Sequence, residues 1–458
     1  MSSMFRWTAV SPRPGEPVAP DERLAWGKTI GIGAQHVVAM FGATFVFPVV
    51  MGLDPNLAIM FSGICTILFL LVTANKVPSY LGTSASFVAG VATIRAQGGN
   101  SADVTGAILI AGVILLAIGV AIHFVGAGFI HKLLPAPVTG AVVLLIGFNL
   151  APVVATVYWP QDQWVALLTA LFLIVAAVRL PGFWARIAVL LALVFGYVLS
   201  WIFDMAIGPI TSVLPGSTDP VAHDRVSWAG VEAANWIGLP SGVLSDGVGV
   251  VHGPSFSLSF ALLVIPGVIA LVAENTGHVK AVAEMTGKNL DPYMGRAIAA
   301  DGGATALSSL FGGSPTTTYA ENIGVMSSTK VYSTAAYYVA ALVAILLGLC
   351  PKFGAIVNAT PGGVLGGVTV VLYGMIGLVG AKVWVDNRVD FGSSVNLVGL
   401  APGIIAGIGG VSLKLTDNFE LGGIALGSIL VIVGYHLVNT GRSRSHSDHG
   451  SPDTAPAR

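Results

Sequence analysis

The chain has 458 residues, of which 54% are apolar and only 9% are charged, with a formal net charge of −1. A soluble domain carries roughly 25% charged residues, so this composition excludes an ordinary soluble protein and indicates a polytopic protein of the lipid bilayer. The 58 glycines agree with this class, because small residues let transmembrane helices approach closely. We expect no nucleic-acid partner.

The first 26 residues are predicted to form a cytoplasmic N-terminal segment. They contain Arg6, Arg13, Asp21, Glu22 and Arg23 and no small-residue cleavage pattern, so a cleavable signal peptide is not expected.

Apolar stretches between charged or Pro/Gly-rich breaks then predict an all-α architecture with fourteen transmembrane segments, since a helix crossing a bilayer needs about 20 residues. The ranges are 27–50, 57–74, 78–95, 103–125, 135–154, 163–179, 186–207, 258–282, 295–311, 314–327, 332–350, 359–381, 394–411 and 421–440. With both termini in the cytoplasm, this count leaves few basic residues outside, as the positive-inside rule requires. They are Arg95, Arg225, Lys352 and Lys414.

A long loop, 208–257, divides the chain into two predicted repeats, 27–207 and 258–440. It is expected to be external and has an acidic balance. Seven spans in each half predict inverted repeats, because an odd number of spans turns the second copy upside down.

Two interrupted segments occupy matching places in the two halves. The third segment of the first half contains Pro78–Phe87, PSYLGTSASF, and the third of the second half opens with Gly312–Tyr319, GGSPTTTY. Glycine, proline and β-branched residues disfavour a continuous helix there. Spans 3 and 10 are therefore predicted to be broken by short extended segments, which point to a central transport site. The alternative is that Gly and Pro are simply frequent in transmembrane helices.

Residues 441–458 are predicted to be a disordered cytoplasmic tail, because they are polar and rich in serine and proline. The two cysteines, Cys65 and Cys350, lie in apolar runs, so we expect no disulfide, no metal site and no cofactor.

Two carboxylates within predicted spans are the main candidate site residues. Glu274 lies in the eighth span and Glu321 begins the helical part of the tenth. A lone carboxylate in hydrocarbon costs several kcal/mol, so each is expected to be protonated, paired or facing a hydrated cavity. Structural pairing is the alternative for both.

Histidines and other polar residues near these carboxylates have more than one interpretation. His278 lies four residues after Glu274 on the same helix face, where the two could share a proton, or His278 bonds only a backbone carbonyl. His36, after Gln35 in the first span, is interpreted as structural. Asp301 is placed near the cytoplasmic end of the ninth span, as a cap or ion-pair partner, with a gating role as the weaker alternative. Asn322 either binds ligand or cross-links helices.

The site chemistry indicates a neutral or cationic solute. Extended segments expose backbone N–H groups that suit carbonyl acceptors, and two carboxylates accept from N–H donors. A planar heterocycle with alternating N–H and C=O groups, such as uracil, would satisfy both sets, but this reasoning alone does not name the solute.

Motifs along nearly the whole chain then identify a family. Glu321–Lys330, ENIGVMSSTK, fits at every defined position the nucleobase–ascorbate transporter signature. In it, Gln, Glu or Pro is followed by Asn, any residue, Gly, four unspecified residues, Thr, and Arg, Lys or Gly. Gln35–His36, VPSYLGTSASF, AENTGH and LDPYMGRA also resemble bacterial uracil/xanthine permeases, and their pyrimidine permease branch in particular. The family is also called nucleobase:cation symporter 2.

The resemblance implies a proton symporter with a core domain of spans 1–4 and 8–11 and a gate domain of spans 5–7 and 12–14. It implies that the base is bound by Glu274 and Glu321 and by the backbone near Ala85 and Ala320, with Tyr319 and Ala43 lining the site. Glu274 and His278 would carry the coupled proton, with Asn322, Gln35 and His36 as structural neighbours. Uracil permeases similar to this chain often carry Phe at the position of Ala85, so a larger pocket is expected here.

These observations predict import of uracil, with thymine and xanthine left open, across the bacterial inner (plasma) membrane by alternating access. A homodimer through the gate domains is also left open. The alternative is an anion exchanger or channel of the same inverted-repeat architecture. An enzyme is not expected, because no HExxH, GxSxG or similar context accompanies the carboxylates.

Overall fold

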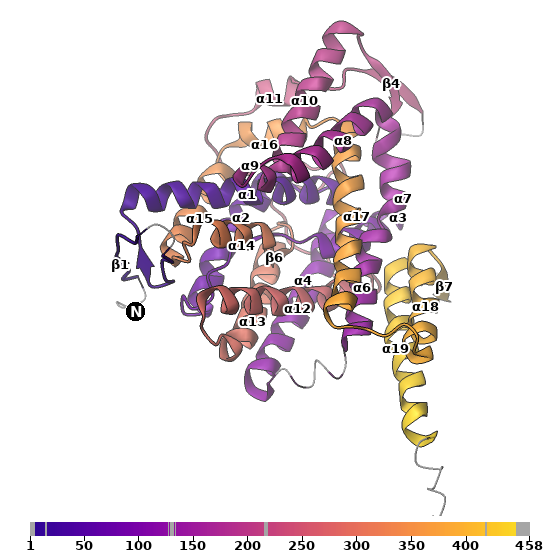
Figure 1. Ribbon diagram of the computed structural model, residues 1–458. Helices are drawn as coiled ribbons and strands as arrows, with labels where there is room; N and C mark the ends of the chain where they lie inside the picture. Colours follow the sequence, from indigo (N-terminus) through magenta and orange to yellow (C-terminus); the bar gives the residue numbers. More distant parts are fainter. Residues whose placement is uncertain are drawn as a thin grey trace, which may run out of the picture. The chain divides into compact units, whose positions relative to one another are not determined.

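The computed structural model describes residues 5–13, 16–126, 128, 132, 134–214, 219–416 and 419–445. Among these residues, seven helices are long and apolar enough to cross a membrane, or eight if α15 (Thr334–Gly348) and α16 (Pro351–Asn358), which meet at 79°, form one span. The predicted class, a predominantly helical polytopic membrane protein, is confirmed in this form (Figure 1).

The chain divides into two compact units, of which the first comprises Met1–Gly128 and Leu150–Met375. Its main helices are α1 (Trp26–Met51), α2 (Pro55–Val72), α3 (Val88–Ala96), α4 (Ser101–Val125), α8 (Gln163–Arg179), α10 (Ala188–Ala206), α12 (Leu258–Thr286), α13 (Asp291–Leu310), α14 (Ala320–Thr329), α15, α16 and the first part of α17 (Gly362–Asp386). Shorter helical pieces are η1 (Ala85–Phe87), α7 (Ala151–Val153), η2 (Val154–Tyr158), η3 (Trp159–Gln161), α9 (Phe183–Arg186) and α11 (Ala229–Ala233).

The second unit comprises Phe129–Asn149 and Ile376–Arg458. It contains α6 (Ala136–Phe148), the end of α17, α18 (Ser394–Ile408), the antiparallel strands β7 (Ser412–Thr416) and β8 (Phe419–Gly422), and α19 (Gly423–Ser445). The Asn149 side chain donates to the Gly407 carbonyl over 2.6 Å and fastens the end of α6 to α18. Whether the two units coincide with a core and a gate domain stays a prediction.

Close backbone approaches hold the first unit together. An added Cβ at Gly302 of α13 would overlap the backbone of Leu116 on α4, and one at Gly119 would overlap the backbone of Ala299. The pair α2–α15 is built the same way, because a Cβ at Gly63 would overlap the Ala341 carbonyl. Small residues therefore replace the hydrophobic effect as the means of bringing these helices together.

The outward surface of α8 is apolar. Leu171, Val175 and Val178 are 50%, 58% and 75% exposed, an arrangement that suits lipid and would be unfavourable in water.

The N-terminal segment docks onto the end of the signature region. Strands β1 (Thr8–Ala9) and β2 (Glu22–Arg23) pair in parallel. Between them, the Val18 amide donates to the Lys330 carbonyl over 2.8 Å and the Tyr332 amide donates back to the Val18 carbonyl over 2.9 Å.

The long loop contains two strands, β4 (Ile210–Val213) and β5 (Pro220–His223), which pair antiparallel. Arg225, just after β5, forms ion pairs with Asp162 at the start of α8 (2.7 Å) and Asp204 near the end of α10 (3.1 Å). All three side chains are nearly buried, so these bonds fasten the beginning of the loop to both helices.

Helix bounds lie within a few residues of the predicted ranges. Helix α17 continues to Asp386 rather than ending at 381, α13 begins at Asp291 rather than 295, and α19 continues through Ser445 instead of ending at 440. Residues 441–445 are therefore helical, whereas the rest of the predicted tail, 446–458, lies outside the described residues.

Candidate functional site

The site is built on two short strands far apart in sequence. Strand β3 (Leu81–Thr83) pairs antiparallel with β6 (Thr316–Thr318), with Gly82 opposite Thr317. The pairing extends at both ends, because the Ser84 amide donates to the Pro315 carbonyl (2.9 Å) and the Tyr319 amide donates to the Tyr80 carbonyl (3.1 Å). Every residue of both strands is buried.

Each strand leads into a short helix. Strand β3 is followed by η1 and α3, and β6 by α14, whose first residue is Ala320. The first backbone N–H groups of a helix have no partner within it. Because the strands are antiparallel, the two helix starts, at Ala85 and at Ala320, lie at the two opposite ends of the small sheet.

Tyr319 clamps the two halves together. Its hydroxyl donates to the Thr83 carbonyl over 2.7 Å and accepts from Thr44 Oγ1 of α1 over 3.1 Å. The ring crosses the strand at Gly82, where a Cβ would overlap both Tyr319 and Thr44. Glycine is therefore required at position 82.

Glu274 and Glu321 meet near this clamp. Glu274 of α12 lies within electrostatic range of Glu321 and of Asp301, and the Tyr319 hydroxyl lies within range of both glutamates. Glu274 is half-buried, and Glu321, in the first turn of α14, is exposed. Both carboxyl groups can therefore reach water or a polar ligand, although they belong to helices of an apolar chain.

A chain of hydrogen bonds runs behind the glutamates. Asn275 Nδ2 donates to Asp301 (2.7 Å) and to the Leu271 carbonyl (3.0 Å), so Asn275 Oδ1 must be the acceptor from Thr318 Oγ1 (3.2 Å). The Thr318 hydroxyl has one proton, and it must therefore accept from His278 Nδ1, which lies 2.7 Å away. His278 consequently carries its proton on Nδ1, which leaves Nε2 to accept or bind a proton.

Asp301 differs from its predicted place. It lies in the middle of α13, fully buried, and accepts from Asn275 and, over 3.1 Å, from Thr316 Oγ1 of β6. The prediction put it near the cytoplasmic end of the ninth span. The neighbouring Gly302 instead permits the close approach of α4.

His36 and Asn322 contact each other on α1 and α14. Asn322 Nδ2 lies 3.1 Å from His36 Nδ1 and 3.0 Å from the His36 carbonyl, and both side chains are fully buried. These bonds fasten the start of α14 to α1, and they are the helix cross-link that was one of the two interpretations of Asn322.

The remaining predicted residues lie on the same elements. Ala43 precedes Thr44 on α1 and is half-buried, as are Gln35 and Ala85, whereas Ala320 is exposed. The polar residues that sequence reasoning missed are Thr44, Asn275, Thr305, Thr316 and Thr318. Asn275 stands within the AENTGH motif, which was a usable signal.

A separate cavity of about 250 Å³ lies between α1, α10, α16 and the start of α17. Its lining is almost wholly apolar, with Phe41, Phe45 and Leu193 among the wall residues. It lacks the carboxylates and paired strands described above, so it does not suit a ligand with several hydrogen-bonding groups.

Comparison with known proteins decides the family. The Permease family profile for xanthine and uracil permeases matches residues 27–416. The chain belongs to the xanthine/uracil permease family. As members of this family are transporters, it is not an enzyme.

Permease relatives match almost end to end. The chain is 42% identical over 445 residues to the putative pyrimidine permease RutG of Escherichia coli, covering 95% of this chain and 94% of that one. It is 34% identical over 434 residues to the uracil permease of Bacillus caldolyticus, covering 93% and 95%. It is 32% identical over 433 residues to the uracil permease of Escherichia coli, covering 92% and 93%.

Solved structures share the fold at low identity. The transmembrane domain of the cyanobacterial bicarbonate transporter BicA matches with a TM-score of 0.53 and 14% identity, covering 90% of this permease and 95% of that chain. The murine anion transporter Slc26a9 in its inward-facing state matches with a TM-score of 0.61 and 13% identity, covering 91% and 69%.

Proposed function

We propose that this permease imports uracil together with protons, and that the base binds where β3 and β6 meet. The observation that carries the proposal is that Glu274 and Glu321 lie close together beside one small sheet, at each end of which a helix begins. The names of its relatives, a putative pyrimidine permease and uracil permeases, support the substrate class.

The base is held by complementary hydrogen bonds. Free N–H groups at the starts of η1 and α14, near Ala85 and Ala320, donate to the carbonyl oxygens of uracil, and Glu274 and Glu321 accept from its ring N–H groups. Tyr319 and Ala43 line the pocket. A site of this kind rejects analogues that leave one of its polar groups unpaired. Ala85 leaves room for a larger base, so thymine and xanthine are the competitors to test.

Glu274 is the coupling group, assisted by His278. Protonation of one carboxylate and binding of a neutral base together reduce the charge of the site, which lowers the cost of moving it through an apolar environment. The hydrogen-bond chain from Asp301 to His278 supports this role, because it fixes Nδ1 as a donor and leaves Nε2 as the titrating position.

The architecture consists of fourteen spans in two inverted repeats, with spans 3 and 10 broken. Packing that is symmetric between the halves supports this. Helix α4 packs on α13, and α15 and α2, their counterparts in the opposite halves, pack on each other. The same exchange relates the pair α1–α15 to the pair α12–α4. Repeats of this kind serve alternating access, by rocking one group of helices against another around a fixed site.

The protein lies in the bacterial inner membrane with both termini in the cytoplasm. The excess of basic residues in the predicted cytoplasmic segments supports the orientation.

Anion exchange, the alternative function, is not favoured by this site. The likeness to bicarbonate and anion transporters extends to the fold alone. Glu274 and Glu321 would repel an anion at the place where the base is proposed to bind.

Uptake of labelled uracil into proteoliposomes tests the proposal. Unlabelled uracil should fully inhibit the uptake of labelled uracil, and sulfate should not inhibit it. The degrees to which thymine and xanthine inhibit it rank the affinities of the pocket for these bases. An inward proton gradient should increase accumulation. Uptake that does not depend on the proton gradient and that sulfate inhibits would support the anion transporter instead.

A further inference from the structure

The end of the long loop forms a strap, defined as Gly242–Ser255. It closes on itself, because the Val250 amide donates to the Gly242 carbonyl over 2.9 Å and the Leu244 amide donates to the Val248 carbonyl over 2.7 Å. The Ser255 amide then donates to the Ala102 carbonyl of α4 over 2.8 Å. Surface loops are usually among the most variable and mobile parts of a protein. The number of hydrogen bonds made by the strap is therefore unusual for a loop and indicates that its position matters.

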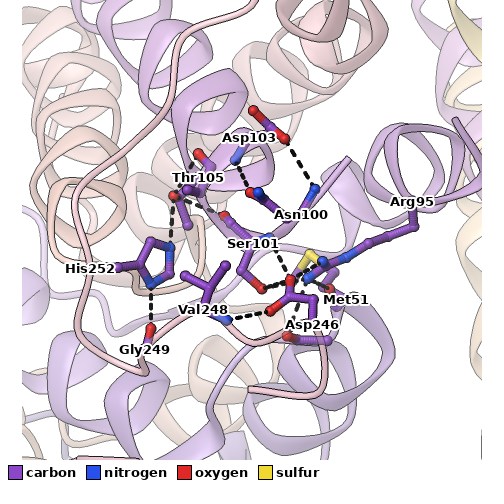
Figure 2. Close-up of polar contacts among 12 residues, drawn as sticks. Met51, Arg95, Asn100, Ser101, Asp103, Thr105, Asp246, Val248, Gly249 and His252 are labelled. Atoms are coloured by element: carbon purple, nitrogen blue, oxygen red, sulfur yellow. Dashed lines mark hydrogen bonds and ion pairs between the residues drawn. The ribbon is translucent and has the colours of Figure 1, made fainter. Parts of the chain in front are cut away.

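Asp246 is the residue that fastens the strap. Its Oδ2 lies 2.5 Å from Arg95 Nη1 and accepts from the Ser101 amide (2.6 Å) and the Ser101 hydroxyl (2.7 Å), while Oδ1 accepts from the Val248 amide (3.2 Å) (Figure 2). Four donors converge on one half-buried carboxylate. Charge-assisted bonds of this number hold a side chain in a defined place.

Arg95 carries the connection to the ends of three helices. It lies in the last turn of α3, and its Nη2 donates to the Met51 and Gly52 carbonyls (3.2 and 3.3 Å) at the end of α1 and to Ser101 Oγ (2.8 Å) at the start of α4. Helix α3 continues the chain from β3 and η1, so its position is linked to that of Ala85.

His252 carries a second connection, to the other broken segment. Its Nδ1 donates to the Gly249 carbonyl (2.8 Å), and its Nε2 lies 3.2 Å from Thr105 Oγ1 of α4 (Figure 2). The ring lies against Gly312, where a Cβ would overlap it. Gly312 has a φ of +87°, which favours glycine, and it begins the turn into β6.

The two connections meet at the site. Beyond Gly312, Ser314 Oγ lies 2.9 Å from Thr83 Oγ1, and the Ser84 amide donates to the Pro315 carbonyl. The strap therefore touches the lead-in to β6 through His252 and the end of α3 through Arg95, without itself contacting Glu274 or Glu321 in the hydrogen bonds described.

We propose that Asp246 is a positioning residue for the nucleobase site: it holds the strap on α3 and α4, and the strap sets the positions of η1 and α14. This inference rests on the proposed function for its ligand, uracil. The contacts of Asp246 also favour its ionised form. Burial alone would raise the pKa of Asp246, but the bonds from Ser101, Arg95 and Val248 lower it to about 2.

Hydrogen exchange of the ligand-free protein tests the positioning role without relying on the substrate. Asp246→Asn should speed exchange of the Ser101 and Val248 amides and also of the amides from Thr316 to Glu321. Asp224→Asn, which changes an exposed aspartate of the same loop, should leave both regions as in the wild type. Faster exchange in the strap with unchanged exchange in 316–321 would overturn the proposal.

Binding of labelled uracil to purified, folded protein provides the second readout. The Kd should rise about fivefold or more in Asp246→Asn, as for a typical coupling between separate sites, and stay unchanged in Asp224→Asn. A merely structural role would reduce the yield of folded protein and leave the Kd of the remainder unchanged, and that result would contradict the proposal.

A milder variant covers the case in which Asp246→Asn does not fold. Ser101→Ala removes one donor to Asp246 and keeps the ion pair with Arg95, so its Kd should lie between those of the wild type and the expected Asp246→Asn value. An unchanged Kd and unchanged exchange in 316–321 would again contradict the inference. Failure of the wild type to bind uracil would contradict the proposed function alone, because the exchange experiment needs no ligand.

Discussion

His278 Nδ1 lies 2.7 Å from Thr318 Oγ1. The direction of this hydrogen bond is determined by Asn275 and Asp301, which continue the same chain of hydrogen bonds. The Asn275 amide nitrogen donates to Asp301, and its oxygen accepts from the Thr318 hydroxyl. Because this bond uses the only proton of the Thr318 hydroxyl, the Thr318 oxygen accepts from His278. A buried aspartate on α13 thereby determines which nitrogen of a histidine on α12 can exchange protons.

Thr318→Val tests this hydrogen-bond chain. The change leaves Asn275 Oδ1 and the His278 N–H without their partner, and a buried unsatisfied group costs about 1–3 kcal/mol. The melting temperature of the purified protein should fall, and the pH profile of uracil uptake should shift as the histidine loses its fixed tautomer.

Thr276→Val is the matched control on α12. The Thr276 hydroxyl bonds only the Val272 carbonyl of its own helix, over 2.7 Å, so both measurements should stay close to the wild type. Equal effects of the two substitutions would show that the chain has no special role.

Glu274→Gln should uncouple transport from protons. Glutamine keeps the shape and can still bond a ligand, but it cannot take up the coupled proton. Concentrative uptake driven by a proton gradient should fall to simple equilibration, while exchange of labelled for unlabelled uracil continues. Glu284→Gln, an exposed position further along α12, should behave as the wild type. Full gradient-driven accumulation by Glu274→Gln would remove Glu274 from the coupling role.

Adjacent glycines of α13 offer a test of the helix packing. Gly302→Ala should destabilise the protein by about 1–3 kcal/mol, because its Cβ would overlap the backbone of α4 and overpacking costs that much. At Gly303 a Cβ meets nothing within 4 Å, so Gly303→Ala should be neutral or stabilise by up to about 1 kcal/mol, since alanine is the better helix former. Thermal melts of the two variants compare them directly, and equal melting temperatures would contradict the described packing.

The predominantly helical class, the family and the helix ranges followed from the sequence, because hydropathy and the ENIGVMSSTK motif are local signals. The place of Asp301 did not follow. Its partners Asn275 and Thr316 are 26 and 15 residues away, and nothing in AADGG shows that α4 packs over Gly302.

The strap could not be predicted from the sequence for a related reason. The acidic balance of the loop was noted, but the pairing of Asp246 with Arg95 spans 151 residues. Hydrophobic periodicity carries no information on which charge of a polar loop meets which helix end.

Acid should loosen the strap in a defined range. The pKa of Asp246 is lowered from 3.8 to about 2 in the folded protein, so the ionised carboxylate stabilises the folded state above about pH 4, and this contribution is lost as the pH falls through about 2. The melting temperature of the wild type should therefore exceed that of Asp246→Asn by a constant amount above about pH 5, and the difference should shrink between about pH 4 and pH 2. A difference that is independent of pH down to 2 would show that the ionised carboxylate is not what holds the strap.

Equilibrium binding of labelled uracil to purified protein tests the location of the site most directly, with Glu321→Ala compared against Glu284→Ala and the wild type. A hydrogen bond to a charged group contributes about 1.5–3 kcal/mol, so loss of the Glu321 carboxylate should weaken binding by about 10- to 150-fold, with Glu284→Ala unchanged. Uracil affinity that survives intact in folded Glu321→Ala would place the base elsewhere and contradict the account.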